Sequence, residues 1–248
     1  MDSILTFSNV CAGYGKTTIL NDLSFSVSQG HIYGVIGPNG CGKTTMLNTL
    51  AGMILPSSGT ITFCGQDITK TSADARCRMG IGRTYQIPRP FERMSVYENV
   101  LCSAVFGQGL TQITGRETAL QALELTGLAE KRYMKAGALP LLDRKRLEIA
   151  RAIGSRPKLL LLDEVAAGLT NAEISYMMEL VQRLRTEGYT IIWIEHIIDT
   201  MVHSTDDLMC MAEGRCAVLG RPMDVIHSPQ VEMLYLGAQK DDRTVSES

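Results

Sequence analysis

The stretch that most constrains the fold is "GPNGCGKT", Gly37 to Thr44. It follows the apolar run "HIYGVIG", which indicates a buried strand, and it leads into a helix expected from Lys43. The stretch matches the pattern G-x-x-x-x-G-K-[ST], in which backbone N–H groups and the positive end of a helix converge on one anion. A strand, a glycine loop and a helix in this order predict a phosphate-binding loop in an α/β fold, against the alternative of a glycine turn that binds nothing.

The residues of this loop have distinct expected roles. Lys43 is expected to reach the β- and γ-phosphates of a bound nucleotide, and the hydroxyl of Thr44 is expected to bind Mg²⁺. Cys41 opens a helix, where the pKa of a thiol can be lowered, so a redox role stands as an alternative to a reduced packing residue. The residues predicted to surround the phosphates are Gly37, Pro38, Asn39, Gly40, Cys41, Gly42, Lys43, Thr44 and Thr45.

The composition narrows the class of protein. A chain of 248 residues is long enough for one large α/β domain or for a core domain with an inserted subdomain. The formal net charge of -2 gives no broad positive field, so no nucleic-acid partner is predicted. The apolar runs fall short of the roughly 18 residues that span a bilayer, and the first residues lack a basic signal-peptide region. We therefore expect a cytoplasmic chain whose scattered cysteines stay reduced.

Short antiparallel strands are predicted near both ends of the chain. The first 30 residues alternate between apolar and polar and are interrupted by "AGYG" and "QG", a pattern typical of strands and turns. A hairpin is expected at 58–68, in "SGTITFCGQDI", and another in "LMCMAEGRCAVLG", which turns at Glu213 and Gly214.

Between these regions the pattern changes to helices. Ser95 with Glu98, and Thr114 with Glu117, fit the capping box, in which each side chain satisfies a backbone N–H of the other residue. These start signals predict an inserted α-helical subdomain at about 87–155.

Two apolar runs in the second half predict buried parallel strands. The first, "KLLLLDE", is followed by a helix expected over about 171–187, and the second, "YTIIWIEH", is followed by the helix "IIDTMV". Strand, helix, strand and helix in this order imply a parallel sheet with crossover helices. The predicted fold is α/β: one domain over 1–238 with a parallel-sheet core, an N-terminal antiparallel β subdomain and the helical insert, followed by a polar tail at 239–248.

Four polar residues near strand ends are candidates for chemistry. Asp163 and Glu164 end "LLLLDE" at the carboxyl edge of the predicted sheet, where open α/β folds bind ligands. Adjacent strand residues point to opposite sides, so Asp163 is expected to hold Mg²⁺ and Glu164 to polarise an attacking water. His196 is a candidate donor to the γ-phosphate, with a structural histidine as the alternative. Gln86, in "GRTYQIPRPF", is a candidate metal ligand or water-positioning residue.

Together and in this order, these motifs resemble the ATP-binding subunit of an ATP-binding-cassette (ABC) transporter. The resemblance covers the chain from Phe7 to about Gly237 and implies a P-loop NTPase (RecA-like) core that uses ATP and Mg²⁺. It implies that Tyr14 stacks on adenine, that Gln86 is the glutamine of the Q-loop, and that His196 is the switch histidine. The stretches "GRTYQ", "RLEIARAI", "LLLLDEVAAGL" and "VEMLYLG" look most like the branched-chain and hydrophobic amino-acid uptake group.

One motif of that family is broken in this chain. In the family, the signature Leu-Ser-x-Gly-Gln contacts the γ-phosphate bound to the opposite subunit of a head-to-tail dimer. The aligned residues here are Leu139, Pro140, Leu141, Leu142 and Asp143. Pro140 has neither a hydroxyl nor an N–H, Leu142 adds bulk, and Asp143 is expected to bring negative charge toward an anion. The loss of these hydrogen-bond donors predicts slow hydrolysis at the ATP site that this segment completes on the opposite subunit. The alternative is a variant loop that still closes on nucleotide.

Two smaller departures follow Glu164. Val165 stands where proline is usual in the family, and Thr170, in the D-loop "AGLT", stands where the family often has an acid or an amide. Both concern the face that the resemblance assigns to the dimer.

The resemblance also implies partners. It implies a motor subunit that hydrolyses ATP to drive solute uptake through separate transmembrane permeases, with a solute-binding protein as an indirect partner. A regulatory cassette with little hydrolysis and the cassette of a lipid exporter are the alternatives. The broken signature favours pairing with a second, different cassette subunit, and the segment 87–97 is expected to contact the permease. The chain is therefore expected to be peripheral on the inner face of the cell membrane.

Overall fold

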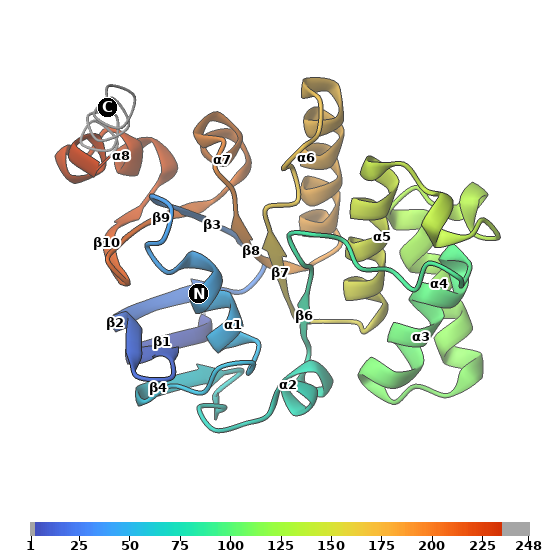
Figure 1. Cartoon of the computed structure of the whole chain (residues 1–248), viewed down its shortest axis with the longest axis horizontal. Coiled ribbons are helices and arrows are strands. Elements are labelled where there is room, and N and C mark those ends of the chain that lie inside the picture. The colour runs from blue at the N-terminus through green and yellow to red at the C-terminus, as the bar shows by residue number, and fades with distance from the viewer. Residues whose placement is uncertain (1–2, 235–248) are drawn as a thin grey trace, which may run out of the picture. The chain divides into compact units, whose positions relative to one another are not determined.

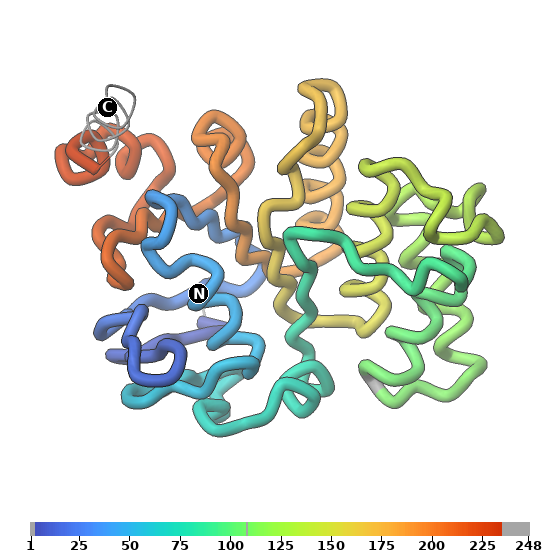
Figure 2. Tube along the Cα trace, viewed as in Figure 1, coloured from blue at the N-terminus to red at the C-terminus, as the bar shows by residue number. Residues whose placement is uncertain are grey.

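The computed structural model describes residues 3–234, so the predicted tail at 239–248 lies outside the described residues. The chain divides into two compact units. Unit 1 contains the residues up to Lys70 together with those from Ile194 onward, and unit 2 contains Thr71–Trp193. In Figure 2 the blue and the orange-to-red parts of the trace belong to unit 1, and the green and yellow parts belong to unit 2.

Unit 1 contains a four-stranded antiparallel sheet in the order β2-β1-β4-β5 (Figure 1). The ring of Phe7 stacks on that of Phe25 with centroids 4.8 Å apart, and Phe25 stacks on Tyr33 at 5.6 Å. Because β1 pairs with β2, and β4 with β5, in antiparallel register, both strand predictions for this region are confirmed. The strands are β1 (Ser3–Tyr14), β2 (Thr17–Ser28), β4 (Ser58–Phe63) and β5 (Gln66–Asp67).

Unit 1 has three further strands, of which β3 leads into the glycine loop. β3 runs parallel to β9, β9 runs antiparallel to β10, and every residue of β3 is buried, as its apolar sequence predicts. The second hairpin turns at Glu213 and Gly214, whose φ angles of 48° and 75° are those of a tight hairpin turn, so this prediction is confirmed. The strands are β3 (Ile32–Ile36), β9 (Asp207–Ala212) and β10 (Arg215–Gly220).

Helices follow these strands along the chain. α1 begins at Lys43, directly after the glycine loop, as predicted. The expected helix "IIDTMV" is also present. The helices are α1 (Lys43–Leu50), α7 (Ile198–Ser204) and α8 (Pro222–Ile226).

The helical part of unit 2 confirms one predicted capping box and corrects the other. Ser95 Oγ accepts from the N–H of Glu98 at 3.1 Å, and Glu98 Oε2 accepts from the N–H of Ser95 at 2.6 Å. The box at Thr114 was wrong, because α4 starts earlier: Thr111 is its N-cap, and the Thr111 hydroxyl accepts from the N–H of Thr114 at 3.3 Å. The elements are α3 (Val96–Gln108), α4 (Gln112–Leu125), η1 (Ala129–Lys131), η2 (Ala136–Ala138) and α5 (Leu141–Gly154).

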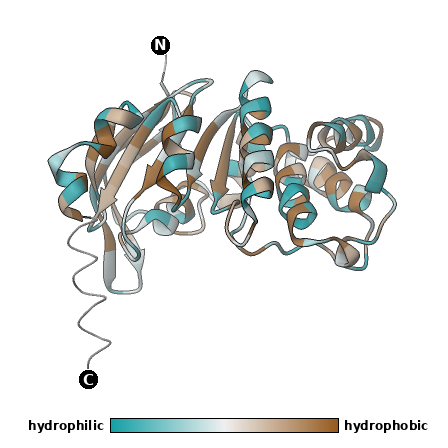
Figure 3. Ribbon diagram, turned by 90° about the horizontal axis from the view of Figure 1, so that it is seen from above, coloured by the Kyte–Doolittle hydropathy of each residue, from teal (hydrophilic) through white to brown (hydrophobic). Residues whose placement is uncertain are grey.

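The strands of unit 2 lie in the order β8-β7-β6, and β6 runs parallel to β7. All five residues of β7 are buried, as predicted for "LLLLD". α6 buries Met177, Leu180 and Leu184, and Figure 3 shows the helices of the structure carrying both hydrophilic (teal) and hydrophobic (brown) residues. The short elements α2 and β6 were not predicted. The bounds are α2 (Ala73–Met79), β6 (Ile81–Arg83), β7 (Leu159–Asp163), α6 (Asn171–Thr186) and β8 (Thr190–Ile194).

Candidate functional site

The glycine loop of unit 1 is shaped by close backbone approach. A Cβ on Gly37 would lie 2.2 Å from the carbonyl oxygen of Met211, and the φ of 146° at Gly37 also disfavours a side chain. Gly42, with φ of 107°, is the N-cap of α1. The loop therefore needs glycine at both positions, and it delivers its backbone to the start of α1, where N–H groups can bind an anion.

Lys43 is folded over this loop. Its side chain is buried, with 6% exposure, and Nζ donates to the carbonyl of Gly37 at 2.6 Å and to that of Pro38 at 3.1 Å. An ammonium held among backbone carbonyls at the start of a helix is placed to exchange these acceptors for phosphate oxygens. The contacts of Lys43 thus suit the predicted phosphate-binding role.

The proposed redox role of Cys41 receives no support from its surroundings. Burial raises the pKa of the Cys41 thiol, and the nearby Lys43 opposes this shift only in part. The backbone carbonyl of Cys41 accepts from the N–H of Gly214 at 2.9 Å, which joins the loop to the β9–β10 turn. The expectation of a lowered pKa was therefore wrong, because the thiol is shielded from water.

Two other predicted residues lie in unit 1. Tyr14 ends β1 as a residue that is 51% exposed, and its hydroxyl accepts from Asn48 Nδ2 of α1 at 2.7 Å. The exposed Tyr14 ring is thereby tied to the helix that follows the glycine loop. His196 is exposed in the short connection between β8 and α7.

Asp163, at the end of β7 in unit 2, is 2% exposed and forms an ion pair with a residue that sequence reasoning missed. Arg83 Nη2 lies 3.2 Å from Asp163 Oδ2, and the Arg83 guanidinium lies 5.2 Å from the centre of the Tyr85 ring. The pairing was foreseeable in part, since Arg83 belongs to "GRTYQ" at the end of a strand next to β7.

Glu164 is held through both its main chain and its side chain. Its φ of 49° is left-handed, which is unusual for a residue with a Cβ. Gln86 Nε2 donates to Glu164 Oε2 at 2.5 Å, and Lys145 Nζ donates to the Glu164 carbonyl at 3.0 Å. The structure thus brings the predicted residues Gln86 and Glu164 together, while Asp163 has a different partner.

The signature segment differs from its prediction at Asp143. Pro140 is the N-cap of α5, and Asp143, in the first turn, is 2% exposed. The Asp143 carboxylate is paired with Lys131 and, at 2.7 Å, with Arg146 Nη1. The expectation that Asp143 brings charge toward an anion was wrong, because burying a carboxylate requires compensation and two cations of the same unit supply it.

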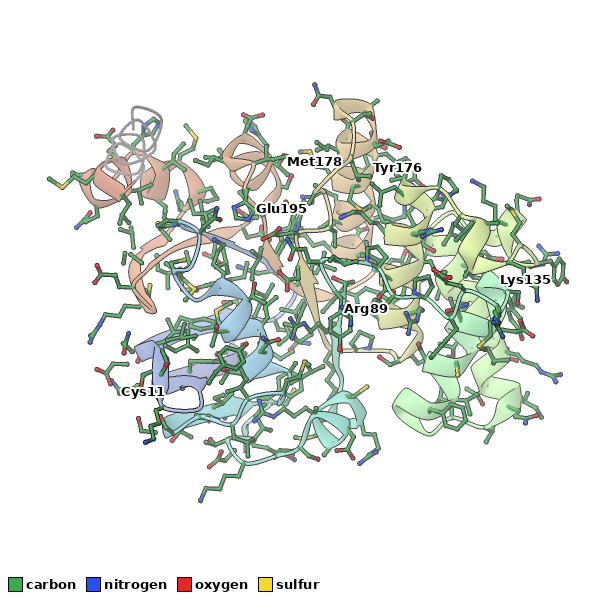
Figure 4. All side chains as sticks on the ribbon, viewed as in Figure 1. Cys11, Arg89, Lys135, Tyr176, Met178 and Glu195 are labelled. Carbon is green, nitrogen blue, oxygen red and sulfur yellow. The ribbon has the colours of Figure 1, made fainter. Side chains whose placement is uncertain are left out.

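Arg146 extends this ion pair into a network. Its Nε donates to the carbonyl of Thr126 at 2.6 Å, its Nη2 donates to the carbonyl of Gly127, and its guanidinium lies 4.9 Å from the centre of the ring of Tyr176 on α6 (Figure 4). Asp143 therefore orients an arginine that joins α5 to the end of α4 and to α6.

α5 also holds the loop that follows Gln86. Glu148 Oε1 accepts from the N–H of Arg89 at 2.9 Å, and Arg151 Nη1 donates to the carbonyl of Arg89 at 2.9 Å (Figure 4). Asn99 of α3 binds both backbone groups of Phe91, at 2.8 and 3.1 Å. The loop is thus fixed through its main chain to two helices.

Thr170, which departs from the family pattern, has a local role. It is the N-cap of α6, and Glu173 Oε2 accepts from both its N–H and its hydroxyl at 2.8 Å. A threonine is suited to such a cap.

A strand–glycine loop–helix in unit 1, together with the buried parallel strand β7 of unit 2, which ends at Asp163 directly before Glu164, defines a P-loop NTPase of the α/β class. The family model for the ABC transporter matches residues 20–167, and the chain belongs to this family. As a member, it is the ATP-binding subunit of a transporter and an ATPase. Cassettes of this kind dimerise and work with transmembrane permeases.

Curated relatives fall into two transport groups. The chain is 34% identical to a probable branched-chain amino acid transport ATP-binding protein LivG of Archaeoglobus fulgidus, over 96% of this chain and 97% of the relative. It is 32% identical to the lipopolysaccharide export system ATP-binding protein LptB of Haemophilus influenzae, over 96% and 98%. The family is thus shown at nearly full length, while the solute differs between relatives.

Solved structures show the same fold. The ADP conformation of an ATP-binding cassette of an ABC transporter matches with a TM-score of 0.86 and 30% identity, covering 96% of this chain and all of that one. This agreement confirms the predicted fold class, a parallel-sheet core with an antiparallel β subdomain and a helical insert. Among residues 3–234, no helix combines the length and the apolar character needed to cross a membrane.

Proposed function

We propose that this chain hydrolyses ATP to drive uptake of branched-chain or other hydrophobic amino acids through membrane permeases. The observation that carries the proposal is the 34% identity to LivG over nearly the full length of both chains. The chain would then lie at the inner face of the cell membrane, attached through those permeases, with a solute-binding protein as an indirect partner and no nucleic acid.

The residues of unit 1 would hold the nucleotide. Lys43 would bind the β- and γ-phosphates, together with the backbone N–H groups of the loop and the hydroxyls of Thr44 and Thr45. Tyr14 would stack on adenine, which its exposed ring and its hydrogen bond to α1 support. His196 would donate to the γ-phosphate, and its exposed position before α7 is compatible with that role.

The residues of unit 2 would act on water and metal. Glu164 would polarise the attacking water, and Gln86, hydrogen-bonded to it at 2.5 Å, would position that water and report the state of the γ-phosphate. A carboxylate from Asp163, an amide from Gln86 and a hydroxyl from Thr44 are oxygen ligands of the kind Mg²⁺ prefers. In the described part of the chain no cluster of three acidic, histidine or cysteine side chains could hold a metal. A bound nucleotide would supply phosphate oxygens as further ligands of Mg²⁺.

Two other functions are favoured by specific observations. The 32% identity to LptB supports a lipid-export cassette as the second candidate. The departures at Pro140 and Leu142 support a regulatory cassette that binds ATP with little hydrolysis, if two copies of this chain pair with each other. The presence of Lys43, Glu164 and His196 favours hydrolysis, because a purely structural chain needs no base.

We also propose that the partner cassette is a different chain with an intact signature. The ATP bound by this chain would then meet a complete set of donors, whereas the ATP of the partner would meet Pro140 and Leu142. Pro140 still lacks an N–H and a hydroxyl, so that second site would hydrolyse slowly. Repulsion by Asp143 is not part of this proposed difference between the two ATP sites, because its carboxylate is paired with cations inside unit 2.

Purification of the assembled transporter tests this set of proposals. We expect permease subunits and a second, different cassette to copurify, and the complex in vesicles with its binding protein to accumulate radiolabelled leucine when ATP is supplied. Glu164→Gln should remove that accumulation. A complex that extracts lipopolysaccharide or other lipid and does not transport leucine would establish the lipid-export function instead.

The segment Ile87–Tyr97 is proposed to contact a permease. Its backbone is fixed at Arg89 and Phe91, while Phe91 is 48% exposed and the centre of its ring lies 5.1 Å from the guanidinium of Arg151. A fixed backbone that presents an exposed aromatic ring suits a contact that transmits force.

A cysteine crosslink is the direct test of this contact. Phe91→Cys is expected to form crosslinks with cysteines placed along the cytoplasmic loops of the permease, and Phe106→Cys, also exposed in unit 2, is the comparison position. If Phe91→Cys formed no crosslink at any loop position, that result would contradict the proposed contact.

A further inference from the structure

Helix α5 carries a buried lysine, Lys145, next to the residue proposed as the base. Lys145 is 4% exposed, and its Nζ donates to the main-chain carbonyl of Glu164 at 3.0 Å. We infer that Lys145 is a positioning residue for Glu164: it fixes the backbone from which the carboxylate projects. The inference rests on the proposed role of Glu164 in hydrolysis.

The backbone at Glu164 needs such a restraint. With φ of 49°, Glu164 occupies a left-handed conformation that residues with a Cβ adopt at a cost in free energy, so neighbouring contacts must hold it there. Its carbonyl accepts from Lys145 and also from the N–H of Ala167 at 3.2 Å. Without the ammonium, the turn after β7 would keep one of these two hydrogen bonds and could relax toward a commoner conformation.

The direction of the carboxylate depends on this turn. Gln86 Nε2 holds Glu164 Oε2 at 2.5 Å, so the side chain is fixed at its tip by Gln86 and at its root by Lys145. A base must sit within hydrogen-bond reach of its water, and a shift of about 1 Å can cost on the order of 10²-fold in rate. Lys145 acts at the root, where a small change of φ moves the carboxylate most.

The same helix carries the signature segment. Pro140 is the N-cap of α5, and Lys145 lies little more than one turn further along. A displacement of the signature end of α5 would therefore be transmitted through Lys145 to Glu164. This gives a physical link between the segment proposed to face the partner's nucleotide and the base proposed to act on the nucleotide of this chain.

A purely structural lysine predicts a different behaviour. Lys145→Met removes one hydrogen-bond donor, but the Glu164 carbonyl keeps its hydrogen bond from the N–H of Ala167, so we expect the variant to fold. A structural role predicts no change in kcat for a folded variant. A positioning role predicts that kcat falls while the KM for ATP stays the same, because the phosphate-binding residues are unchanged.

The test combines Lys145→Met, Lys145→Arg and Glu164→Gln in the assembled transporter. We expect Lys145→Met to lower kcat by about tenfold at unchanged KM, and Lys145→Arg, which keeps N–H donors, to recover much of the loss. In the Glu164→Gln background, Lys145→Met should change the residual rate by less than about twofold, because a residue acting through Glu164 has nothing left to position. Lys158→Met, at an exposed lysine just before β7, is the matched control and should behave as the parent protein.

Hydrogen exchange gives a readout that does not depend on turnover. The amides that follow Glu164, including that of Ala167, should exchange faster in Lys145→Met than in the parent or in Lys158→Met. Unchanged kcat and unchanged exchange in Lys145→Met, with Glu164→Gln inactive, would overturn this inference alone. Parent-like hydrolysis by Glu164→Gln would instead overturn the proposed role of Glu164, and with it the basis for the inference.

Discussion

Lys43→Ala is expected to remove most ATP binding, whereas Glu164→Gln is expected to keep ATP binding and stop turnover. Lys43 is an ammonium held at the start of α1, so its loss removes a charge-assisted contact to phosphate, worth about 10²-fold in affinity. Glu164 holds no phosphate in the proposed mechanism, and the amide that replaces its carboxylate cannot take a proton from water. This replacement should lower the rate by about 10² to 10⁴.

Titration with a fluorescent ATP analogue and steady-state ATPase assays separate these two effects. Lys16→Ala, at the exposed β1–β2 turn, removes the same charge away from the glycine loop and should leave affinity unchanged. Glu164→Gln should also accumulate as a nucleotide-bound closed dimer on gel filtration. Hydrolysis by Glu164→Gln at the parent rate in the assembled complex would show that Glu164 is not the base.

Asp143→Asn is expected to lower the free energy of unfolding by about 3 kcal/mol, because it leaves Lys131 and Arg146 without the carboxylate that compensates them. The loss of stability should extend to the end of α4, since Arg146 also donates to carbonyls there. Urea denaturation followed by circular dichroism measures the effect.

The control for this prediction is another ion pair of unit 2. Asp74 is paired with Arg78 at 2.5 Å, but both side chains are largely exposed, so Asp74→Asn should change stability little. An Asp143→Asn variant with parent stability and faster ATP hydrolysis would contradict the structural role and would restore Asp143 as a phosphate-facing residue. Because Asp143 is part of the fold, a variant designed to restore the signature motif should carry Pro140→Ser and Leu142→Gly and should keep Asp143.

Local patterns in the sequence predict a large part of this fold. The glycine loop, the apolar strands β3 and β7 and the turn at Glu213 each depend on residues that are neighbours along the chain, so their periodicity and turn chemistry are sufficient. The start of α4 shows the limit of such signals. Thr111 and Thr114 are both plausible caps, and Glu117 favoured the wrong one although the helix begins at Gln112.

Contacts between elements account for what the sequence did not reveal. In the sequence, Asp143 is recognisable only as a charged residue in a broken motif. The arrangement of η1 and α5 brings Lys131 and Arg146 to it. Lys145 carries no motif at all, because its acceptor is a backbone carbonyl on a different element. Arg83 was within a recognised stretch, but its partner Asp163 lies on the neighbouring strand.

The division of the chain has a consequence for its synthesis on the ribosome. β3, which leads into the glycine loop, pairs with β9 from near the other end of the chain, whereas Thr71–Trp193 is one continuous stretch. Domains generally fold as units while the chain grows from its N-terminus. The nascent phosphate-binding loop must therefore wait for almost the whole message to be translated before its strand gains this neighbour, and a stalled or truncated product would lack it altogether.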